Sequence, residues 1–181
     1  MKPTEVLVEE HEVILKMLGV IKAISGKIEA VDQQILKDIV DFIRTFADHC
    51  HHAKEEKILY VEAEKSGVPN EEGPIGMMLI EHDEGRGYVK RMDEALRQIG
   101  TGDKKGYQQY AENALNYAAL LEQHIMKENQ ILYPMIDMHL TPKLQKEISA
   151  KFDQLEKKEL GEGVHHKFHQ LVEKLEKKFA G

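Results

Sequence analysis

Apolar side chains along most of the chain recur at intervals of three and four residues, which places them on one face of an α-helix. The first such stripe consists of Leu7, His11, Ile14, Leu18 and Ile21. Thr4, which follows Pro3, is the expected cap of this helix. The pattern predicts a helix that ends near the Ser25-Gly26 break and carries an imidazole within its apolar face.

The same spacing predicts a second helix from Asp32, its expected cap, to about Ser66. Its buried face is marked by Ile35, Ile39, Phe42 and Phe46. Glycine and proline residues then punctuate SGVPNEEGPIG, residues 66–76, which predicts a loop.

Two more stripes follow this loop. One runs from Ile75 to Ile99, includes His82, and ends at GTGD, residues 100–103. The other predicts a helix from about Lys104 to Met138. Its buried positions are Tyr110, Ala114, Tyr117, Leu121, His124, Glu128, Leu132 and Met135.

Four amphipathic helices joined by short turns predict an all-α fold, an up-and-down antiparallel four-helix bundle over residues 1–140. Residues 141–181 are expected to form a C-terminal helical extension. Thr141-Pro142 is a cap followed by proline at the first helical position, and GEG at 161–163 separates two helices. We expect the extension to pack on the bundle as a lid or to form a homodimer surface.

Composition narrows the classes of function. The chain has 181 residues, of which 41% are hydrophobic and 31% charged, enough for one sizeable core. A net charge of −7 without a polybasic stretch argues against nucleic acid and membrane partners. Because neither a leader-like segment nor an apolar run of ~18 residues is present, we expect a cytoplasmic protein. The single Cys50 excludes an internal disulfide, whereas ten histidines are many.

A ten-residue stretch occurs twice. HHAKEEKILY at 51–60 and HIMKENQILY at 124–133 share their His, Lys, Glu, Ile, Leu and Tyr in register. In HxxxE the imidazole and the carboxylate lie on one helix face, with Cβ atoms about 5–6 Å apart, so one metal ion can bind both. Each of the other two helices has one histidine within its apolar face, His11 or His82, which we call the seam histidines. Two HxxxE motifs together with the two seam histidines predict a two-ion site in the bundle interior. Its members are His11, His51, Glu55, His82, His124 and Glu128.

A structural interpretation competes with this one, because a single seam histidine or an isolated HxxxE pair is more often structural than metal-binding. Burying two unpaired carboxylates and several imidazoles together would, however, cost several kcal/mol in a domain whose stability is about 5–15 kcal/mol. A metal cluster removes that penalty, so the residues taken together favour a metal site.

The ligands within Asp48-His49-Cys50-His51-His52 depend on the helical phase. Extending the stripe from Phe42 and Phe46 selects His49, His52 and Glu56, whereas the repeat selects His51 and Glu55. We prefer the repeat, because a π-bulge between Phe46 and His51 would reset the phase. His52 is a candidate second ligand from the same turn, and His49 and Glu56 are expected around the site or on the surface.

Three segments together resemble the hemerythrin-like, or HHE cation-binding, family of non-haem di-iron proteins. They are HHAKEEKILY, GPIGMMLIEHDEGR at 73–86 and HIMKENQILYPMI at 124–136. The resemblance covers about residues 5–138 and implies two iron ions with an oxo or hydroxo bridge. It implies His11, His51, Glu55, His82, His124 and Glu128 as ligands. His52 falls where an iron-sensing relative has an extra carboxylate ligand, so the resemblance makes it a candidate for a fifth imidazole ligand.

The chain also departs from the family pattern. Oxygen-carrying hemerythrins have two histidines on the third helix, but Met78 and Arg86 lie four residues either side of His82. Val61 stands where the family often has proline, while Pro134 keeps it in the second copy. The resemblance is therefore closer to the iron-repair and sensing branches than to a reversible oxygen carrier.

Counting ligands predicts an open position. Two ions offer about twelve positions. Five imidazoles, two bridging carboxylates and one bridging hydroxide fill about eleven of these positions, which leaves about one for dioxygen, nitric oxide or peroxide. Nitrogen and oxygen donors suit iron or manganese, and zinc accepts the same donors.

Three functions follow from these residues. The first is a di-iron protein that binds or senses a small ligand, or handles iron under oxidative or nitrosative stress. The second is a di-iron oxidoreductase acting on nitric oxide or peroxide, with Tyr60 or Tyr133 as proton or electron donors and an unidentified redox partner. The third is a helical interaction module without metal. Whether the protein is an enzyme stays open at this stage.

Overall fold

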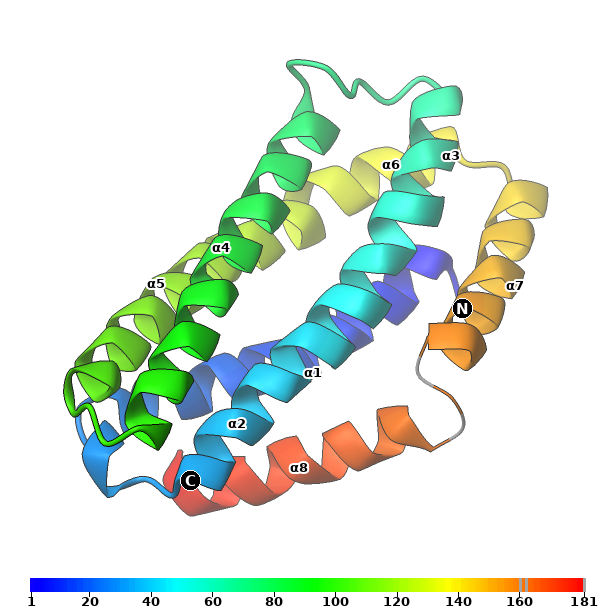
Figure 1. Cartoon of the computed structure of the whole chain (residues 1–181). Coiled ribbons are helices and arrows are strands. Elements are labelled where there is room, and N and C mark those ends of the chain that lie inside the picture. Colours follow the sequence, from blue (N-terminus) through cyan, green and yellow to red (C-terminus); the bar gives the residue numbers. More distant parts are fainter. Residues whose placement is uncertain (160, 162, 181) are drawn as a thin grey trace.

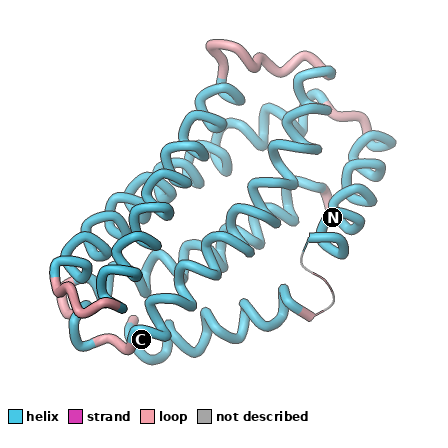
Figure 2. Tube along the Cα trace, in the orientation of Figure 1, coloured by secondary structure: helices cyan, strands magenta, loops and turns pink. Residues whose placement is uncertain are grey.

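A computed structural model describes residues 1–159, 161 and 163–180. These residues form helices and connecting loops without a strand, so the all-α prediction is confirmed (Figures 1 and 2). The helices are α1 (Pro3–Ser25), η1 (Ile28–Ala30), α2 (Gln33–Phe42), η2 (Ile43–His52), η3 (Glu55–Leu59), α3 (Tyr60–Lys65), α4 (Pro74–Gly100), α5 (Lys105–Lys127), η4 (Glu128–Leu132), α6 (Tyr133–His139), α7 (Pro142–Glu159) and α8 (Val164–Phe179). No described helix combines the length and apolar character needed to cross a bilayer.

Of the helix caps predicted at Asp32 and Thr4, the structure shows the first and not the second. Asp32 caps α2 as predicted, because its Oδ1 accepts a hydrogen bond from the Gln34 amide at 2.8 Å. The prediction for Thr4 is wrong, since α1 already begins at Pro3. Thr4 is buried within the helix, and its hydroxyl donates to Asp137 Oδ1 at 2.9 Å. A tertiary contact has therefore taken the hydroxyl that local capping would use.

The helical segment from Gln33 to Lys65 widens into π-helix over η2 and η3. The predicted π-bulge between Phe46 and His51 is confirmed, since both residues lie within η2. Each π turn accommodates one extra residue and so shifts the helical phase. Phe46 and His51 consequently both face inward, while His49 is exposed.

The apolar core consists of two clusters with a polar layer between them. One cluster includes Ile14 and Phe46, and the other includes Leu59 and Ile136. Apart from Thr4, the buried polar residues of the described chain fall where one cluster gives way to the other. These residues are Glu10, His11, His51, His52, Lys54, Glu55, His82, His124 and Glu128.

Packing between helices brings these segments together. In Figure 1, α4 runs along α5, and α1 lies beside α5 and α8. α2 also contacts α4. The polar layer is therefore lined by α1, η2 and η3 from the first part of the chain and by α4, α5 and η4 from the part that follows.

The C-terminal helices contact the rest of the molecule along α1. α7 also contacts η2 and η3, and α8 places Phe168 edge-on to Phe42 at a ring-centre distance of 5.8 Å. Thr141 caps α7 as expected, because its Oγ1 accepts a hydrogen bond from the Leu144 amide at 3.3 Å. Of the GEG segment, Glu162 lies outside the described residues. The domain division at residue 140 stays a prediction.

Candidate metal centre

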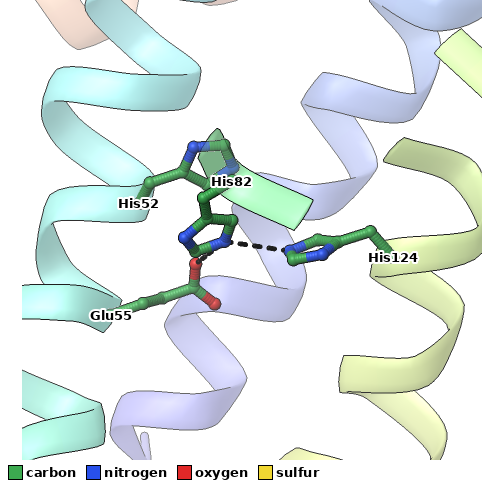
Figure 3. A group of neighbouring side chains, drawn as sticks. All are labelled: His52, Glu55, His82 and His124. Carbon is green, nitrogen blue, oxygen red and sulfur yellow. Dashed lines mark hydrogen bonds and ion pairs between the residues drawn. The ribbon is translucent and has the colours of Figure 1, made fainter. Parts of the chain in front are cut away.

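All seven predicted site residues lie together in the buried polar layer, and none is more than 4% exposed. They are His11, His51, His52, Glu55, His82, His124 and Glu128. Figure 3 shows four of them close together, with His52 and Glu55 on one helical ribbon and His82 and His124 on two others. Their role as ligands stays a prediction, but the folded chain places them where that role requires.

The side chains form two groups that share Glu55. One group contains His11, His51 and Glu128, and the other contains His52, His82 and His124. Within each group, one candidate ligand atom from every residue lies within 4.8 Å of the others. We call them the first half and the second half of the centre.

Each half brings two imidazole nitrogens to a short distance. His11 Nε2 and His51 Nε2 are 2.9 Å apart, and His82 Nε2 and His124 Nε2 are 3.0 Å apart. Such a contact is a hydrogen bond only if one of the two Nε2 atoms carries a proton and the other does not. It is also the ~3.0 Å expected between neighbouring ligands of one ion at ~2.1 Å bond lengths and right angles.

The outer nitrogens of the five imidazoles are engaged elsewhere. Nδ1 of four rings lies 2.7–2.9 Å from a carboxylate or amide oxygen, and Nδ1 of His52 lies 3.4 Å from Asp48 Oδ1. A proton on Nδ1 satisfies each of these oxygens and leaves Nε2 as the electron-pair donor. The outer contacts therefore favour the tautomer that a metal ion needs.

The partners of Nδ1 follow a crossed pattern along the chain. The glutamate that precedes each seam histidine contacts Nδ1 of the histidine in one of the repeated decamers. Glu10 pairs with His51, and Glu81 pairs with His124. The residue that follows Glu55 or Glu128 contacts Nδ1 of a seam histidine. Accordingly, Glu56 pairs with His82 and Asn129 pairs with His11.

Two tyrosines hold the shared carboxylates. The Tyr60 hydroxyl donates to Glu128 Oε1 and lies 3.2 Å from Glu55 Oε1, and the Tyr133 hydroxyl donates to Glu55 Oε1 at 2.5 Å. Burial raises the pKa of both tyrosines well above the usual value, and the charges of Glu128 and Glu55 add to it. The hydroxyls therefore stay protonated and keep one oxygen of each carboxylate in place.

The remaining carboxylate oxygens face the imidazoles. Glu128 Oε2 is 3.2 Å from His11 Nε2, while its Oε1 is 3.2 Å from His124 Nε2. Glu55 Oε2 lies 3.4 Å from His82 Nε2 and 3.7 Å from His51 Nε2. Each carboxylate thus touches both halves, as a bridging ligand does.

A cation fits this donor set. Within the described part of the chain, Glu55 Oε2 and Glu128 Oε2 are buried without a hydrogen-bond partner, and such atoms are costly unless charge is balanced. Burial opposes charge on His124, yet Glu128 raises its pKa to about 10, so without a metal a proton has to supply the balance. A metal ion would balance the same carboxylates and bind the Nε2 atoms as well.

Two lysines pair with the glutamates that precede the seam histidines. Lys54, which is 1% exposed, donates to Glu10 and to Glu156 of α7, and Lys127 donates to Glu81. Sequence reasoning missed Glu10, Glu81 and Lys54 as parts of the site. A signal existed, because Glu-His occurs at 10–11 and 81–82 and the lysine recurs in both decamers.

The other histidines considered and Cys50 lie outside the set of candidate ligands of this centre. His49 is exposed, and Glu56, predicted around the site or on the surface, contacts the outer nitrogen of His82. His165 of α8 lies over the first half, with Nε2 3.7 Å from Glu10 Oε1. Burial raises the pKa of Cys50 to about 12, which suits a packing role.

Comparison with known proteins agrees with this geometry. Residues 2–136 match the model of the hemerythrin HHE cation-binding domain. Uncharacterised proteins of Mycobacterium tuberculosis and Mycobacterium bovis are 21% identical to the chain over 174 residues. That alignment covers 94% of this chain, and the chain spans 66% of the length of these relatives. The matched family and its buried His and Glu clusters confirm the resemblance: the chain belongs to the hemerythrin HHE cation-binding domain family.

Proposed function

We propose that the protein holds two iron ions in an up-and-down four-helix arrangement and binds a small ligand there. The five imidazoles and two shared carboxylates are the proposed ligands. The observation that carries the proposal is the pairing of Nε2 atoms, 2.9 Å and 3.0 Å apart, beside two buried carboxylate oxygens that accept no hydrogen bond from the described residues. Manganese or zinc would use the same donors.

The role of the protein follows from what its own residues do around the ions. Iron, when bound, supplies redox change and an exchangeable position for dioxygen, nitric oxide or peroxide. The Nδ1 contacts orient the imidazoles, and the tyrosine hydroxyls hold the carboxylates. Burial excludes bulk water from the donors. This arrangement supports a binding, sensing or iron-handling protein. That the protein is cytoplasmic and has neither nucleic acid nor membrane partners stays a prediction from its composition.

An oxidoreductase acting on nitric oxide or peroxide is the second candidate. It is favoured by the Tyr60 hydroxyl, which lies between the two shared carboxylates and donates to Glu128. A protonated hydroxyl at that place is positioned to supply a proton to the centre. Turnover would also require electrons from a redox partner.

The test begins with metal analysis and the absorption spectrum of freshly purified protein. About two irons per chain and the near-ultraviolet bands of a bridged ferric pair are expected. His124→Ala should lose the bands, while His139→Ala, which changes an exposed histidine outside the layer, should keep them. No stoichiometric metal, with melting unchanged by a chelator, would instead support the metal-free interaction module.

Measurements on the iron-loaded protein distinguish reversible ligand binding from catalytic turnover. Reversible binding of nitric oxide without its consumption supports the sensor or carrier. Catalytic consumption of nitric oxide or peroxide, lost in His124→Ala and kept in His139→Ala, supports the enzyme.

A further inference from the structure

A pocket of ≈ 670 Å³ lies between the last turn of α7 and the first turns of α8, and none of the seven predicted ligands of the buried centre lines it. Glu156 and Lys157 line it from α7, and Glu173 lines it from α8. Three histidines of α8, His165, His166 and His169, also line it. Imidazoles and carboxylates that face one space are typical ligands of divalent transition-metal ions.

Two of these histidines are held side by side. His165 and His169 are four residues apart and therefore lie on one face of α8. Their ring centres are 4.7 Å apart, and the ring planes are inclined by 38°. Both rings pack against Phe46 of η2, at centre distances of 4.9 and 5.9 Å. Because packing already orders the rings, an ion between them would have less conformational entropy to fix.

His169 has an unused hydrogen-bonding group. Its Nε2 atom is buried and has no hydrogen-bond partner among the described residues. Such an atom destabilises the fold unless a ligand or water satisfies it. Burial lowers the pKa of His169, and the neighbouring His165 lowers it further, so the ring is neutral at pH 7 and has an electron pair for an ion.

Packing on Phe46 is the competing explanation for the two imidazoles. It accounts for their rings, but a phenylalanine at position 169 would make the same kind of contact without burying an unpartnered nitrogen. It also leaves unexplained why glutamates line the same pocket. A bound cation accounts for the nitrogen and for the carboxylates.

Glu156 supplies a carboxylate from α7. One oxygen of Glu156, one oxygen of Glu10 and a ring nitrogen of His165 lie within 4.8 Å of one another. Glu10 already pairs with Lys54 and contacts His51, so we leave it out of the ligand set. Lys54 also donates to Oε2 of Glu156 at 2.8 Å, but a carboxylate has a second oxygen that an ion can bind.

We propose that His165, His169 and Glu156 form an outer binding site for one divalent transition-metal ion, separate from the buried centre. Two imidazoles and one carboxylate suit zinc and ferrous iron alike and leave positions for water. Since the ligands come from α7 and α8, the bound ion links the two C-terminal helices beside Glu10. This inference does not depend on the proposed di-iron function.

The experiment uses zinc as the probe, added to the full chain after iron loading and removal of unbound iron. By equilibrium dialysis, the wild type should bind one zinc more than the double variant His165→Phe/His169→Phe, with the iron content of both unchanged. Phenylalanine keeps a ring against Phe46 and removes the nitrogen donors. His139→Phe, which changes an exposed histidine outside the pocket, is the matched control and should bind zinc like the wild type.

Glu156→Gln tests the carboxylate and keeps an oxygen that accepts a hydrogen bond from Lys54. It should raise the dissociation constant for zinc by at least ~10-fold, the lower end of the effects seen for changes around a metal site. Glu147→Gln, at an exposed position of α7, is its matched control and should leave zinc binding unchanged. Should the double variant fail to fold, this second pair of variants decides the question.

The outcomes separate this site from the buried centre. Zinc binding by the double variant or by Glu156→Gln that equals wild-type binding would overturn the outer site and leave the di-iron function intact. Wild type that contains no iron before zinc is added would overturn the di-iron function alone, because the difference of one zinc between wild type and double variant would persist.

Discussion

The two halves of the centre are built from the same parts but sit in different surroundings. Each half has a Glu-His pair on one helix and a His-x-x-Lys-Glu motif on its neighbour. Glu10 pairs with Lys54 in the first half, as Glu81 pairs with Lys127 in the second. Equivalent local sequence therefore produces equivalent local contacts.

Their exposure differs. The Lys54 side chain is 1% exposed and also contacts Glu156 of α7, while Lys127 is 33% exposed. The second half instead gains His52 and a different pocket, lined by His52 and Tyr117 among others. The C-terminal helices therefore cover the first half, whereas this pocket adjoins the second half.

Ligand number and access point to different halves. The first half has two imidazoles and the second has three, so the proposed two-iron ligation would leave its free position on the first. The pocket nevertheless reaches His52 and His82 of the second. Because the Nδ1 contact of His52 is the longest of the five, at 3.4 Å, we predict that His52 is the most easily displaced of the proposed ligands.

Removing a shared carboxylate should abolish both halves at once. Glu128→Ala is expected to lower iron affinity by more than the ~10–100-fold typical of an outer-shell change, because it deletes a ligand of both ions. Metal analysis after gel filtration measures the loss. Glu112→Ala, an exposed position on α5, should keep about two irons. Retention of one iron by Glu128→Ala would show that the halves bind independently.

Acid should empty the centre. Burial opposes charge on His82 and His124, but facing carboxylates raise the pKa of His82 to about 9 and that of His124 to about 10 in the absence of a cation. Protons thus compete with metal, and iron affinity should fall as pH drops from 9 toward 4. Loading at pH 7 should release protons, measurable in weak buffer. Iron occupancy that stays constant down to pH 4 would contradict imidazole ligation.

The buried lysine should matter more for stability than its counterpart. Lys54→Met is expected to lower the free energy of unfolding by ~3–5 kcal/mol, because it leaves Glu10 buried without its ammonium partner. Lys127→Met should cost only ~0–1 kcal/mol, since that pair is partly exposed. Urea unfolding of the two metal-free variants measures both values. Equal losses would refute the asymmetry in burial.

His52→Ala should have the smallest effect on metal binding. It removes the third imidazole of the second half and should leave two irons bound, with nitric oxide affinity raised ~2–10-fold, about 1 kcal/mol for an added open position. His49→Ala, which changes an exposed neighbour, should leave iron content unaltered. Loss of one iron from His52→Ala would identify His52 as an essential ligand.

Much of the fold and donor set could be predicted because the signals are local. Asp32 marked a helix start, and the repeated decamers identified Glu55 and Glu128 by their spacing. Extending the α-helical spacing from Phe46 did not predict that His51 faces inward. A π-helix is stabilised by the surrounding packing and not by the residues of one helical turn alone. The prediction that Thr4 caps a helix failed for a similar reason, because its hydroxyl contacts Asp137, which lies 133 residues away along the chain.

Helical spacing depends on neighbouring residues alone, so local sequence was enough to predict helices that carry imidazoles and carboxylates inside their apolar stripes. Long-range packing, in contrast, covers Glu10 with α7 and α8, brings Glu56 to His82 and leaves a pocket beside Tyr117. These features depend on contacts between segments far apart in the chain, so their physical cause lies in packing.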